Sequence, residues 1–187
     1  MKLLIVESPG KIKKLQSFLS SEWRVTASVG HIRDLPNDGY GIEPPDFRPV
    51  YQVTPDKKDV VARLKALANE ADEVYLASDP DREGEAIAWH LKEVLGLSSY
   101  KRVTYTAITK EDVEAGIAAP RAIDMALVQA QEARRALDRL VGYRVSGPLS
   151  RACSESRMSA GRVQSPAVRI VVDREHEIKT FVSTTHY

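Results

Sequence analysis

Short apolar runs alternate with helical patterns along the first 120 residues. Apolar and β-branched positions predict four strands, at residues 2–6, 24–29, 73–77 and 101–106. Apolar residues at helical spacing predict three helices, at residues 11–19, 57–71 and 84–95. A further short helix is expected after Thr109, a residue that could cap it. Strands that alternate with helices predict a mostly parallel sheet with helices on both faces.

The rest of the chain follows other patterns. Residues 30–55 are rich in Pro and Gly and have no sustained period, which predicts a long ordered loop or an insertion. From Ile123 onward the pattern is helical, with a break expected at Gly147-Pro148 and a further helix at residues 159–178. We therefore expect an α/β domain at residues 1–120 and an incomplete all-α domain at residues 121–187.

Composition narrows the class of protein. Of the 187 residues 43% are hydrophobic, which is enough for a packed core and argues against global disorder. No apolar run approaches the roughly 20 residues that cross a membrane, and the N-terminal apolar stretch is too short for a secretory signal. Cys153 is the only cysteine, which excludes an internal disulfide and a multi-cysteine zinc site. A cytoplasmic protein with no membrane contact is expected.

The net charge of +1 conceals two regions of opposite charge. Residues 1–130 carry 17 Lys and Arg against 20 Asp and Glu, whereas residues 131–187 carry 10 against 6. Nine of those ten basic residues are arginine, whose guanidinium group matches the oxygens of a phosphate. Charge alone leaves two interpretations open for the second region, a phosphate-binding surface and an ordinary solvated helical surface.

Carboxylates are concentrated where two predicted strands end. Glu7 closes the first strand, and Asp79, Asp81 and Glu83 follow a later strand and open a helix. Open α/β sheets bind ligands at the carboxyl ends of their strands. Crowding carboxylates there is unfavourable without a cation, because like charges about 4 Å apart repel by roughly 4 kcal/mol at an effective dielectric near 20. Because no cation is obvious among them, these carboxylates predict a Mg²⁺ site. The alternative is that Ser78 or Asp79 merely caps the helix.

The stretches around these carboxylates resemble one group of proteins. Asp79-x-Asp81-x-Glu83, with a strand-ending glutamate about seventy residues earlier, resembles the Toprim domain of topoisomerases, primases, some nucleases and a recombination mediator. Five stretches resemble type IA DNA topoisomerases, in order along the chain: residues 6–11, 30–36, 77–88, 131–143 and 159–165. The resemblance implies a Toprim fold, which is Rossmann-like with a mostly parallel sheet flanked by helices, followed by the start of a helical DNA-binding domain.

The resemblance also implies an isomerase that relaxes negatively supercoiled DNA without ATP. Such enzymes cleave one strand with a tyrosine, hold the 5′ phosphate covalently, pass the other strand and reseal. By resemblance, Asp79 and Asp81 bind Mg²⁺, with Glu83 and Glu7 as nearby metal ligands. Glu7 would also move a proton to and from the 3′ oxygen, which requires neighbouring carboxylates to raise its pKa. Lys11 would supply positive charge to the phosphoryl transition state, although it could be an ordinary exposed lysine.

A second set of residues is implied to bind the single-stranded segment of DNA that enters the site. The set comprises His31, Arg134, Arg135, Asp138, Tyr143, Ser159, Ala160, Gly161, Arg162, Val163 and Gln164. Small residues around Gly161 let a DNA backbone approach, and phosphate contacts there would give affinity with little sequence information. Arg134 and Asp138 are four residues apart on a helix and could instead form a surface ion pair, worth about 0.3–0.5 kcal/mol. His31 could likewise be a structural loop histidine.

The nucleophilic tyrosine of the family is missing from this sequence. Its motif, Tyr-x-Arg-Thr-Asp-Ser, does not occur; Tyr100-Lys101-Arg102 copies three positions at the start of a predicted strand, and Tyr187 has no motif around it. We expect a nucleoid-associated fragment that does not cleave DNA alone and whose partner is the remainder of a topoisomerase chain. Another Toprim enzyme, a noncatalytic DNA-binding recombination module and a helicase-fused topoisomerase stay open as alternatives.

Overall fold

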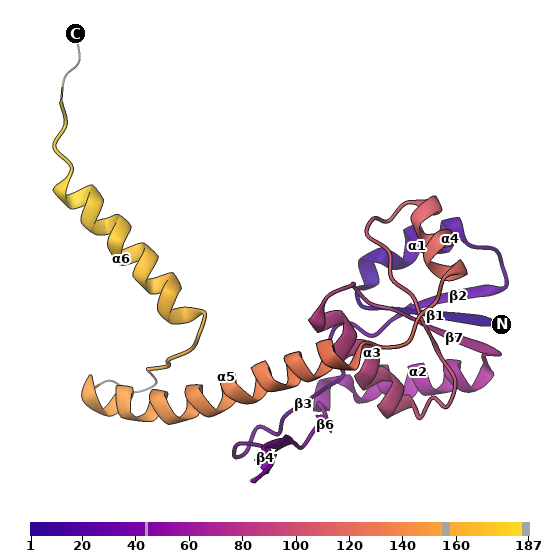
Figure 1. Cartoon of the computed structure of the whole chain (residues 1–187), viewed down its shortest axis with the longest axis horizontal. Helices are drawn as coiled ribbons and strands as arrows, with labels where there is room; N and C mark the ends of the chain where they lie inside the picture. The colour runs from indigo at the N-terminus through magenta and orange to yellow at the C-terminus, as the bar shows by residue number, and fades with distance from the viewer. Residues whose placement is uncertain (44, 155–157, 185–187) are drawn as a thin grey trace. The chain divides into compact units, whose positions relative to one another are not determined.

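A parallel sheet centred on β1 (Lys2–Val6) organises the first part of the protein (Figure 1). In the part of the chain that the computed structural model describes, residues 1–43, 45–154 and 158–184, the sheet has the strand order β2-β1-β7-β8. The other strands are β2 (Trp23–Ala27), β7 (Glu73–Ala77) and β8 (Lys101–Arg102). β1 pairs in parallel with both β2 and β7 along its whole length, so the three strands end at the same edge.

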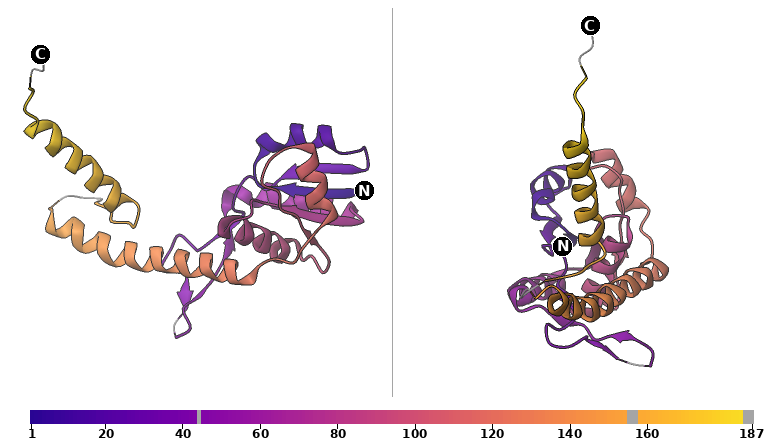
Figure 2. Two further views of the ribbon diagram at one scale, coloured as in Figure 1. Left: turned by 45° about the horizontal axis from the view of Figure 1, so that its top comes forward. Right: turned by 90° about the vertical axis from the view of Figure 1, so that its left-hand side faces the viewer.

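Helices cover both faces of this sheet, as Figures 1 and 2 show. One face carries α1 (Ile12–Phe18) and α4 (Lys110–Ala118), and the other carries α2 (Lys58–Glu70) and α3 (Arg82–Leu95). Parallel strands need crossover connections of this kind, because a short turn cannot return the chain to the same end of the sheet. The layered α/β arrangement predicted from the apolar pattern is confirmed.

Alternate residues of the strands build two separate cores. Leu3 and Ile5 of β1 face the α2–α3 layer, where they join a cluster that includes Leu64 and Leu91. Leu4 and Val6 face the opposite layer, where they pack with residues of α1 and α4 such as Leu15. A fully buried side chain of this size contributes about 1.5–3 kcal/mol. A strand buried on both faces reads as a continuous apolar run, which is the pattern that residues 2–6 show.

The loop after β2 contains two small antiparallel pairs of strands. β3 (Arg33–Asp34) pairs with β6 (Gln52–Val53), and β4 (Ile42–Glu43) pairs with β5 (Arg48–Pro49). Short 3₁₀ turns, η1 (Pro9–Lys11) and η2 (Pro55–Lys57), precede α1 and α2. The long ordered loop expected at residues 30–55 is therefore an insertion with little regular structure, and it lies between β2 and α2.

The helical part begins with α5 (Met125–Ala152) and continues with α6 (Gln164–Thr180). Two compact units, Met1–Arg134 and Arg135–Tyr187, divide within α5. The first turns of α5 belong to the first unit because Ile123 and Val128 are buried in the core of the α2–α3 layer. In the described residues, no helix combines the length and the apolar composition needed to cross a membrane.

Two local predictions, one in each part of the chain, are wrong. The break expected at Gly147-Pro148 does not occur, because α5 contains Pro148 and continues to Ala152. Proline removes one backbone donor and crowds the preceding turn, but here the helix ends four residues later, and the amide of Cys153 still donates to the carbonyl of Leu149. The strand expected at residues 101–106 pairs only at Lys101–Arg102.

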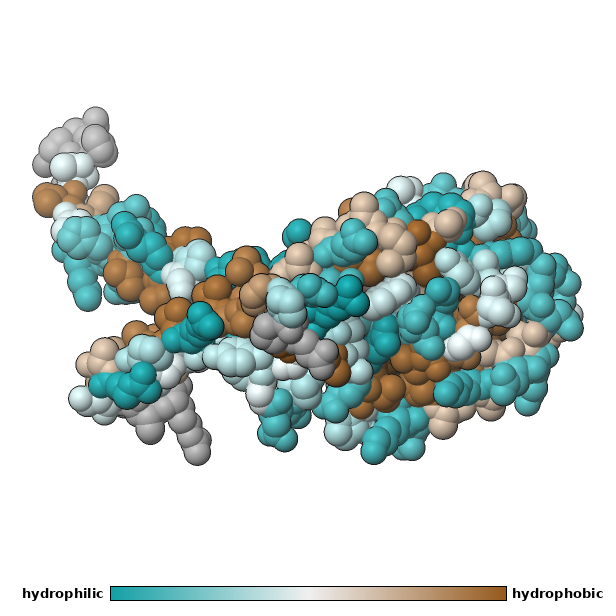
Figure 3. Space-filling model, turned by 60° about the horizontal axis from the view of Figure 1, so that its bottom comes forward, coloured by the Kyte–Doolittle hydropathy of each residue, from teal (hydrophilic) through white to brown (hydrophobic). Residues whose placement is uncertain are grey.

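Every described residue of α6 is exposed to solvent. Its apolar side chains include Val168, Val171, Val172 and Ile178, which recur at helical spacing and are between 55% and 63% exposed. Figure 3 shows apolar residues at the surface of the helical segment. This helix therefore has an apolar stripe without a core beneath it in the described chain.

The ends of the helices in the first unit follow simple capping chemistry. Thr109 caps α4 by accepting a hydrogen bond from the amide of Asp112 at 3.3 Å, as expected. α3 begins after Asp81, whose carboxylate accepts from the amide of Gly84 at 2.8 Å. The residue that caps α3 is thus Asp81, and the alternative in which Ser78 or Asp79 caps the helix is wrong.

Gly84 should not tolerate a side chain. A Cβ atom there would lie 2.0 Å from the carbonyl oxygen of Asp79 and 2.8 Å from its amide nitrogen, so the backbone would have to move. We predict that Gly84→Ala lowers the free energy of unfolding by about 1–3 kcal/mol, a typical cost of overpacking, in urea denaturation. Gly10→Ala is the control, because its Cβ would meet only the Ser8 hydroxyl at 3.7 Å. Equal unfolding midpoints for the two variants would contradict this packing.

Candidate active site

The register of the sheet brings the acidic residues together. Val6 of β1 lies opposite Ala77 of β7, so Glu7 and the segment beginning at Ser78 leave the sheet side by side. Glu7, Asp79 and Asp81 consequently affect one another electrostatically. This convergence at the carboxyl edge of the sheet is the arrangement predicted from the sequence.

Lys11 lies among these carboxylates. Its ammonium group is 2.5 Å from Oδ1 of Asp79, and the turn η1 that carries it follows directly from β1. Ser8 caps this turn by accepting from the amide of Gly10 at 3.3 Å. The expectation that the carboxylates meet without an internal cation is therefore wrong, because Lys11 compensates the charge of Asp79.

Among the described residues, three polar side chains contact Glu83. Nε2 of Gln131 is 2.7 Å from Oε2 of Glu83, and Nη1 of Arg134 is 3.1 Å from Oε1. Nε2 of His31 lies 3.2 Å from the same carboxylate. The first turns of α5 and the loop after β2 thus meet the beginning of α3 at one side chain.

Gln131 was not among the site residues expected from the sequence. It occurs in the stretch 131–143 that resembles topoisomerases, and it lies three residues before Arg134. Residues three apart on a helix share a face, so the position of Arg134 could have identified Gln131 as a second residue directed at the same group.

A strained turn positions His31. Val29 has φ 61° and Gly30 has φ 79°, both in the left-handed region that a β-branched residue such as valine rarely adopts. The amide of Gly30 donates to the carbonyl of Glu7 at 3.1 Å, and the ammonium group of Lys57 donates to the carbonyl of Val29 at 3.0 Å. These two bonds hold the turn against the end of β1.

The pKa of Glu7 is raised above the ordinary value of a glutamate. Burial is the largest cause and the negative charge of Asp79 is the second, whereas Lys11 and His31 oppose the shift. The direction agrees with the expectation, but the main cause is loss of water and not the neighbouring carboxylates. A glutamate that holds its proton more readily is better suited to give that proton to a leaving oxygen.

The residues present suit a magnesium ion held partly by other ligands. Within the described residues, no three His, Cys, Asp or Glu side chains are grouped closely enough to hold a metal ion. Mg²⁺ in phosphate-processing sites is commonly bound by one or two carboxylates, with water and substrate phosphate as the other ligands. Asp79 and Asp81 are two such carboxylates, and each is engaged through Oδ1, by Lys11 and by the amide of Gly84 respectively. Glu83 is engaged through both of its oxygens by residues of α5.

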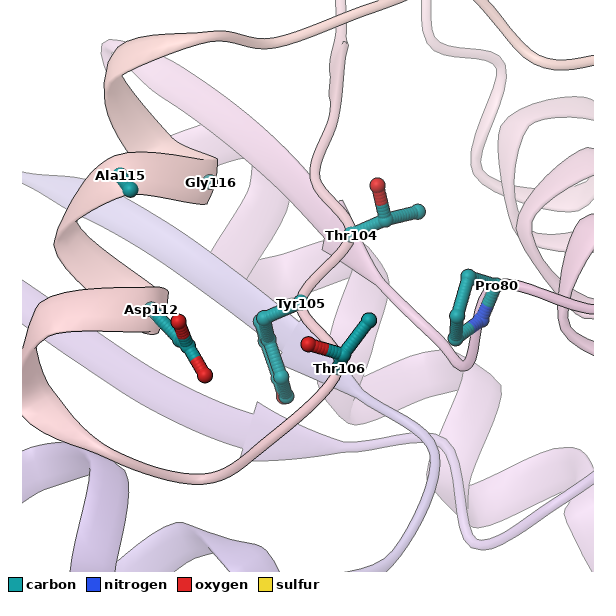
Figure 4. Close-up of a pocket in the computed structure, with 7 residues that line it drawn as sticks. All are labelled: Pro80, Thr104, Tyr105, Thr106, Asp112, Ala115 and Gly116. Atoms are coloured by element: carbon teal, nitrogen blue, oxygen red, sulfur yellow. The ribbon is translucent and has the colours of Figure 1, made fainter.

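A cavity of about 230 Å³ lies beside the acidic segment (Figure 4). Its lining residues are Pro80, Thr104, Tyr105, Thr106, Asp112, Ala115 and Gly116. The buried hydroxyl of Tyr105 has no hydrogen-bond partner in the described chain. Burial and the charge of Asp79 raise the pKa of Tyr105 to about 12, so this phenol stays protonated and is not an activated nucleophile.

The remaining expected DNA-binding residues belong to the second unit. Arg162 makes a bidentate contact with Asp138, with Nε–Oδ1 at 2.9 Å and Nη2–Oδ2 at 3.3 Å. The amide of Ala160 donates to the hydroxyl of Ser146 at 3.0 Å, which holds the segment around Gly161 against α5. Arg162 and Asp138 thus form an ion pair, and Arg134 forms another with Glu83.

The other members of this set in the second unit lie on α5 and around the start of α6. Nη1 of Arg139 donates to the hydroxyl of Tyr143 at 2.7 Å and its guanidinium lies 5.0 Å from the centre of the ring. Ser159 donates to Gln164, the first residue of α6, at 3.2 Å. Val163 is 64% exposed and Arg135 is half-buried on α5. Tyr187 lies outside the described residues.

Comparisons with known proteins agree with these features. The Toprim domain model matches residues 2–108, and a family model described as DNA topoisomerase matches residues 122–187. The chain is 59% identical over all its 187 residues to "DNA topoisomerase I, plasmid" of Xylella fastidiosa (strain 9a5c), and it spans 28% of that protein. It also resembles full-length topoisomerase I from Thermotoga maritima, with a TM-score of 0.82 and 46% identity over 96% of this chain and 31% of that one.

The matched ranges correspond to the two parts of the structure. The sheet with its carboxylate edge lies in the first range, and α5 and α6 lie in the second. Residues 122–187 match the model described as DNA topoisomerase, and the chain as a whole belongs to the Toprim family.

Proposed function

We propose that the chain is the N-terminal part of an ATP-independent type IA DNA topoisomerase that relaxes negatively supercoiled DNA. The reaction would proceed by transient cleavage of one strand, a 5′-phosphotyrosine intermediate, strand passage and religation. The observation that carries this proposal is the meeting of Glu7, Lys11 and Asp79 at one edge of the sheet, in a chain that also matches the DNA topoisomerase family. Because the chain spans 28% of its relative, the remainder of such a protein would carry the tyrosine.

Each side chain at this edge has a role in the proposal. Glu7, with its raised pKa, would give a proton to the 3′ oxygen on cleavage and take it back on religation. Lys11 would place its charge beside the scissile phosphate, where negative charge develops in the transition state. Its present contact with Asp79 supports a location within reach of such a phosphate.

Mg²⁺ is the cofactor that this arrangement suits. Toprim domains in general bind Mg²⁺, and we propose Asp79 and Asp81 as the protein ligands, with Glu7 and Glu83 close by. A bound divalent cation would neutralise charge on the phosphate. Lys11 and Arg134, which now compensate two of the carboxylates, would then be available to the DNA backbone.

The DNA-binding surface would comprise two groups of residues. His31 and Arg134 would contact the strand near the carboxylates, and Arg135 and Arg162 with their neighbours in the second unit would contact the backbone as well. We place the boundary between the Toprim domain and the helical domain near residue 120, between the ranges that the two family models match. A protein with this substrate would work in the cytoplasm, associated with the nucleoid.

The match of residues 122–187 to the DNA topoisomerase model favours a topoisomerase over the two other classes of protein considered, another Toprim enzyme and a recombination module. A primase or nuclease with a Toprim domain would share the carboxylates but not the stretches around Arg134 and Gly161. A recombination module without catalysis would have no need of Glu7, Lys11 and Asp79 in one place. We therefore favour the topoisomerase over both.

Magnesium binding can be measured on this chain directly. We predict that the double variant Asp79→Ala/Asp81→Ala loses the calorimetric Mg²⁺ response of the wild type, because two carboxylates are the usual protein contribution to such a site. Glu70→Ala removes the same kind of charge at the far end of α2 and should behave like the wild type. Lys11→Met should bind Mg²⁺ more tightly, since Lys11 competes for Asp79. Identical responses from the wild type and the double variant would refute the site.

Binding of single-stranded DNA should depend on salt. Each phosphate neutralised on a single strand contributes about −0.7 to the slope of log K against log salt, so Arg134→Ala and Arg162→Ala should each weaken binding and flatten this slope by about that amount. The effect should be similar for different DNA sequences. Arg24→Ala, an exposed arginine of β2, is the matched control.

Asp138→Ala tests how Arg162 is used. If Asp138 holds Arg162 in its productive pose, its loss weakens binding although the net positive charge rises. If Asp138 only competes with phosphate, its loss tightens binding. Unchanged slopes in both arginine variants, with circular dichroism showing intact helices, would mean that the helical segment is an ordinary solvated surface.

The chain alone should leave negatively supercoiled plasmid unchanged in the presence of Mg²⁺. Its sequence has no Tyr-x-Arg-Thr-Asp-Ser motif, and the half-buried Tyr105 stays protonated. A full-length relative should relax the same plasmid under the same conditions. Relaxation by the purified chain that disappears in a Glu7→Ala variant would show that one of its own tyrosines is the nucleophile.

A further inference from the structure

We infer that Arg102 is a positioning residue for the proposed reaction, because its buried guanidinium group fixes the backbone of the acidic segment that presents Asp79. This inference rests on the proposed function, in which Asp79 acts at the scissile phosphate. Arg102 does not touch the reacting groups. It acts through four backbone carbonyl groups and one buried carboxylate.

Arg102 and Glu85 form a fully buried ion pair. The side chains of both residues are 0% exposed, and Nη2 of Arg102 lies 2.8 Å from Oε1 of Glu85. Nε of the same guanidinium is 3.0 Å from that oxygen. One carboxylate therefore neutralises the group and leaves its other donors for the backbone.

The remaining donors are directed at the end of β7. Nη1 donates to the carbonyl groups of Leu76 at 3.2 Å, Ser78 at 2.7 Å and Val103 at 2.6 Å. Nη2 donates to the carbonyl of Asp79 at 2.8 Å. The acidic segment is thus held by its main chain, and the carboxylate of Asp79 stays directed at Lys11.

These bonds begin where the sheet ends. β8 pairs with β7 only at two positions, and the last of them joins Leu76 to Arg102. Beyond it, the carbonyl groups of Ser78 and Asp79 would lack partners from β8, and a buried carbonyl without a partner costs about 1–3 kcal/mol. The guanidinium of Arg102 takes the place of the missing strand residues.

Glu85 connects the same pair to α5. Its carboxylate accepts from the side chain of Arg121 and, at 2.9 Å, from the amide of Asp124, which lies just before α5 begins. The backbones of Arg102 and Arg121 are also hydrogen-bonded to each other. The pair therefore sets the position of Asp79 on one side, and on the other side the start of the helix that carries Gln131 and Arg134 to Glu83.

Stability alone does not account for this pair. Removing two charges from water costs several kcal/mol per ion, and a well-packed apolar pair is often equally or more stable. An apolar side chain could not donate to four carbonyl groups at once. The guanidinium group of arginine can, because its nitrogens form a rigid planar fork of donors. The single ammonium group of lysine cannot reproduce that geometry.

The test compares three single variants of this chain. Arg102→Lys keeps the charge but loses the fork, Glu85→Gln keeps the fork, and Val113→Ala is a buried core change in α4 that lies outside the site. Hydrogen exchange of the amides at residues 78–84, Mg²⁺ affinity by calorimetry with MgCl₂, and urea unfolding are measured for each.

Arg102→Lys should raise hydrogen exchange in the acidic segment and weaken Mg²⁺ binding, each by about tenfold, the equivalent of one net hydrogen bond. Val113→Ala should lower the unfolding midpoint and leave both quantities within about twofold of the wild type. Glu85→Gln, which keeps the guanidinium group but removes its charged partner, should change both quantities less than Arg102→Lys does. If Arg102→Lys does not fold, the double variant Glu85→Met/Arg102→Met replaces it, because it leaves no unpaired buried charge.

Two outcomes overturn the inference. One is an Arg102 variant with exchange and Mg²⁺ affinity like those of Val113→Ala at matched stability. The other is an equal loss of Mg²⁺ affinity in Glu85→Gln, which would assign the effect to charge and not to the fork. If the wild type binds no Mg²⁺, the proposed metal site fails, and the exchange measurement alone still decides whether Arg102 positions the segment.

Discussion

Parallel, in-register pairing of β1 with β7 is the constraint on which the candidate site depends. Because the two strands run in the same direction and end at Val6 and Ala77, the residues that follow them must emerge at one edge. Val6 and Ala77 are about seventy residues apart in the sequence, and the register of the sheet brings them together. A shift of one residue would move every inward-facing side chain of β1 to the opposite face, so the two buried clusters that hold Leu3 and Leu4 also secure the position of Glu7.

Placing several carboxylates at one edge has an electrostatic cost that the protein meets with its own cations. Lys11 pairs with Asp79, and Arg134 pairs with Glu83. Both cations are only partly exposed, so water screens their attraction less than it would at an open surface. In the proposed function the same side chains exchange one anionic partner for another, from carboxylate to phosphate, with no change in the charge that they carry.

Some features of the site follow from short-range patterns and some do not. The apolar run before Glu7 and the acidic residues after residues 73–77 were enough to predict a carboxylate edge, because strand ends in a parallel sheet coincide. The contacts of Lys11 and Arg134 depend on how α1 and α5 pack, which no local pattern contains. The burial of Arg102 is the clearest feature of this second kind. The residues next to an arginine in an edge strand do not reveal whether its side chain is solvated or buried. At Pro148 the local pattern was misleading. Proline predicts a break in a helix, but α5 continues past it to Ala152.

The exposed apolar stripe of α6 has a consequence for the behaviour of the chain in solution. Its exposed apolar surface is formed by Val168, Val171, Val172 and Ile178. Contiguous apolar surfaces of this kind drive association between molecules. Concentrated samples are therefore expected to contain oligomers joined through α6, and these would disperse on dilution. Light scattering or gel filtration at a single high concentration would then detect association through the exposed side chains of α6 and not a biological assembly.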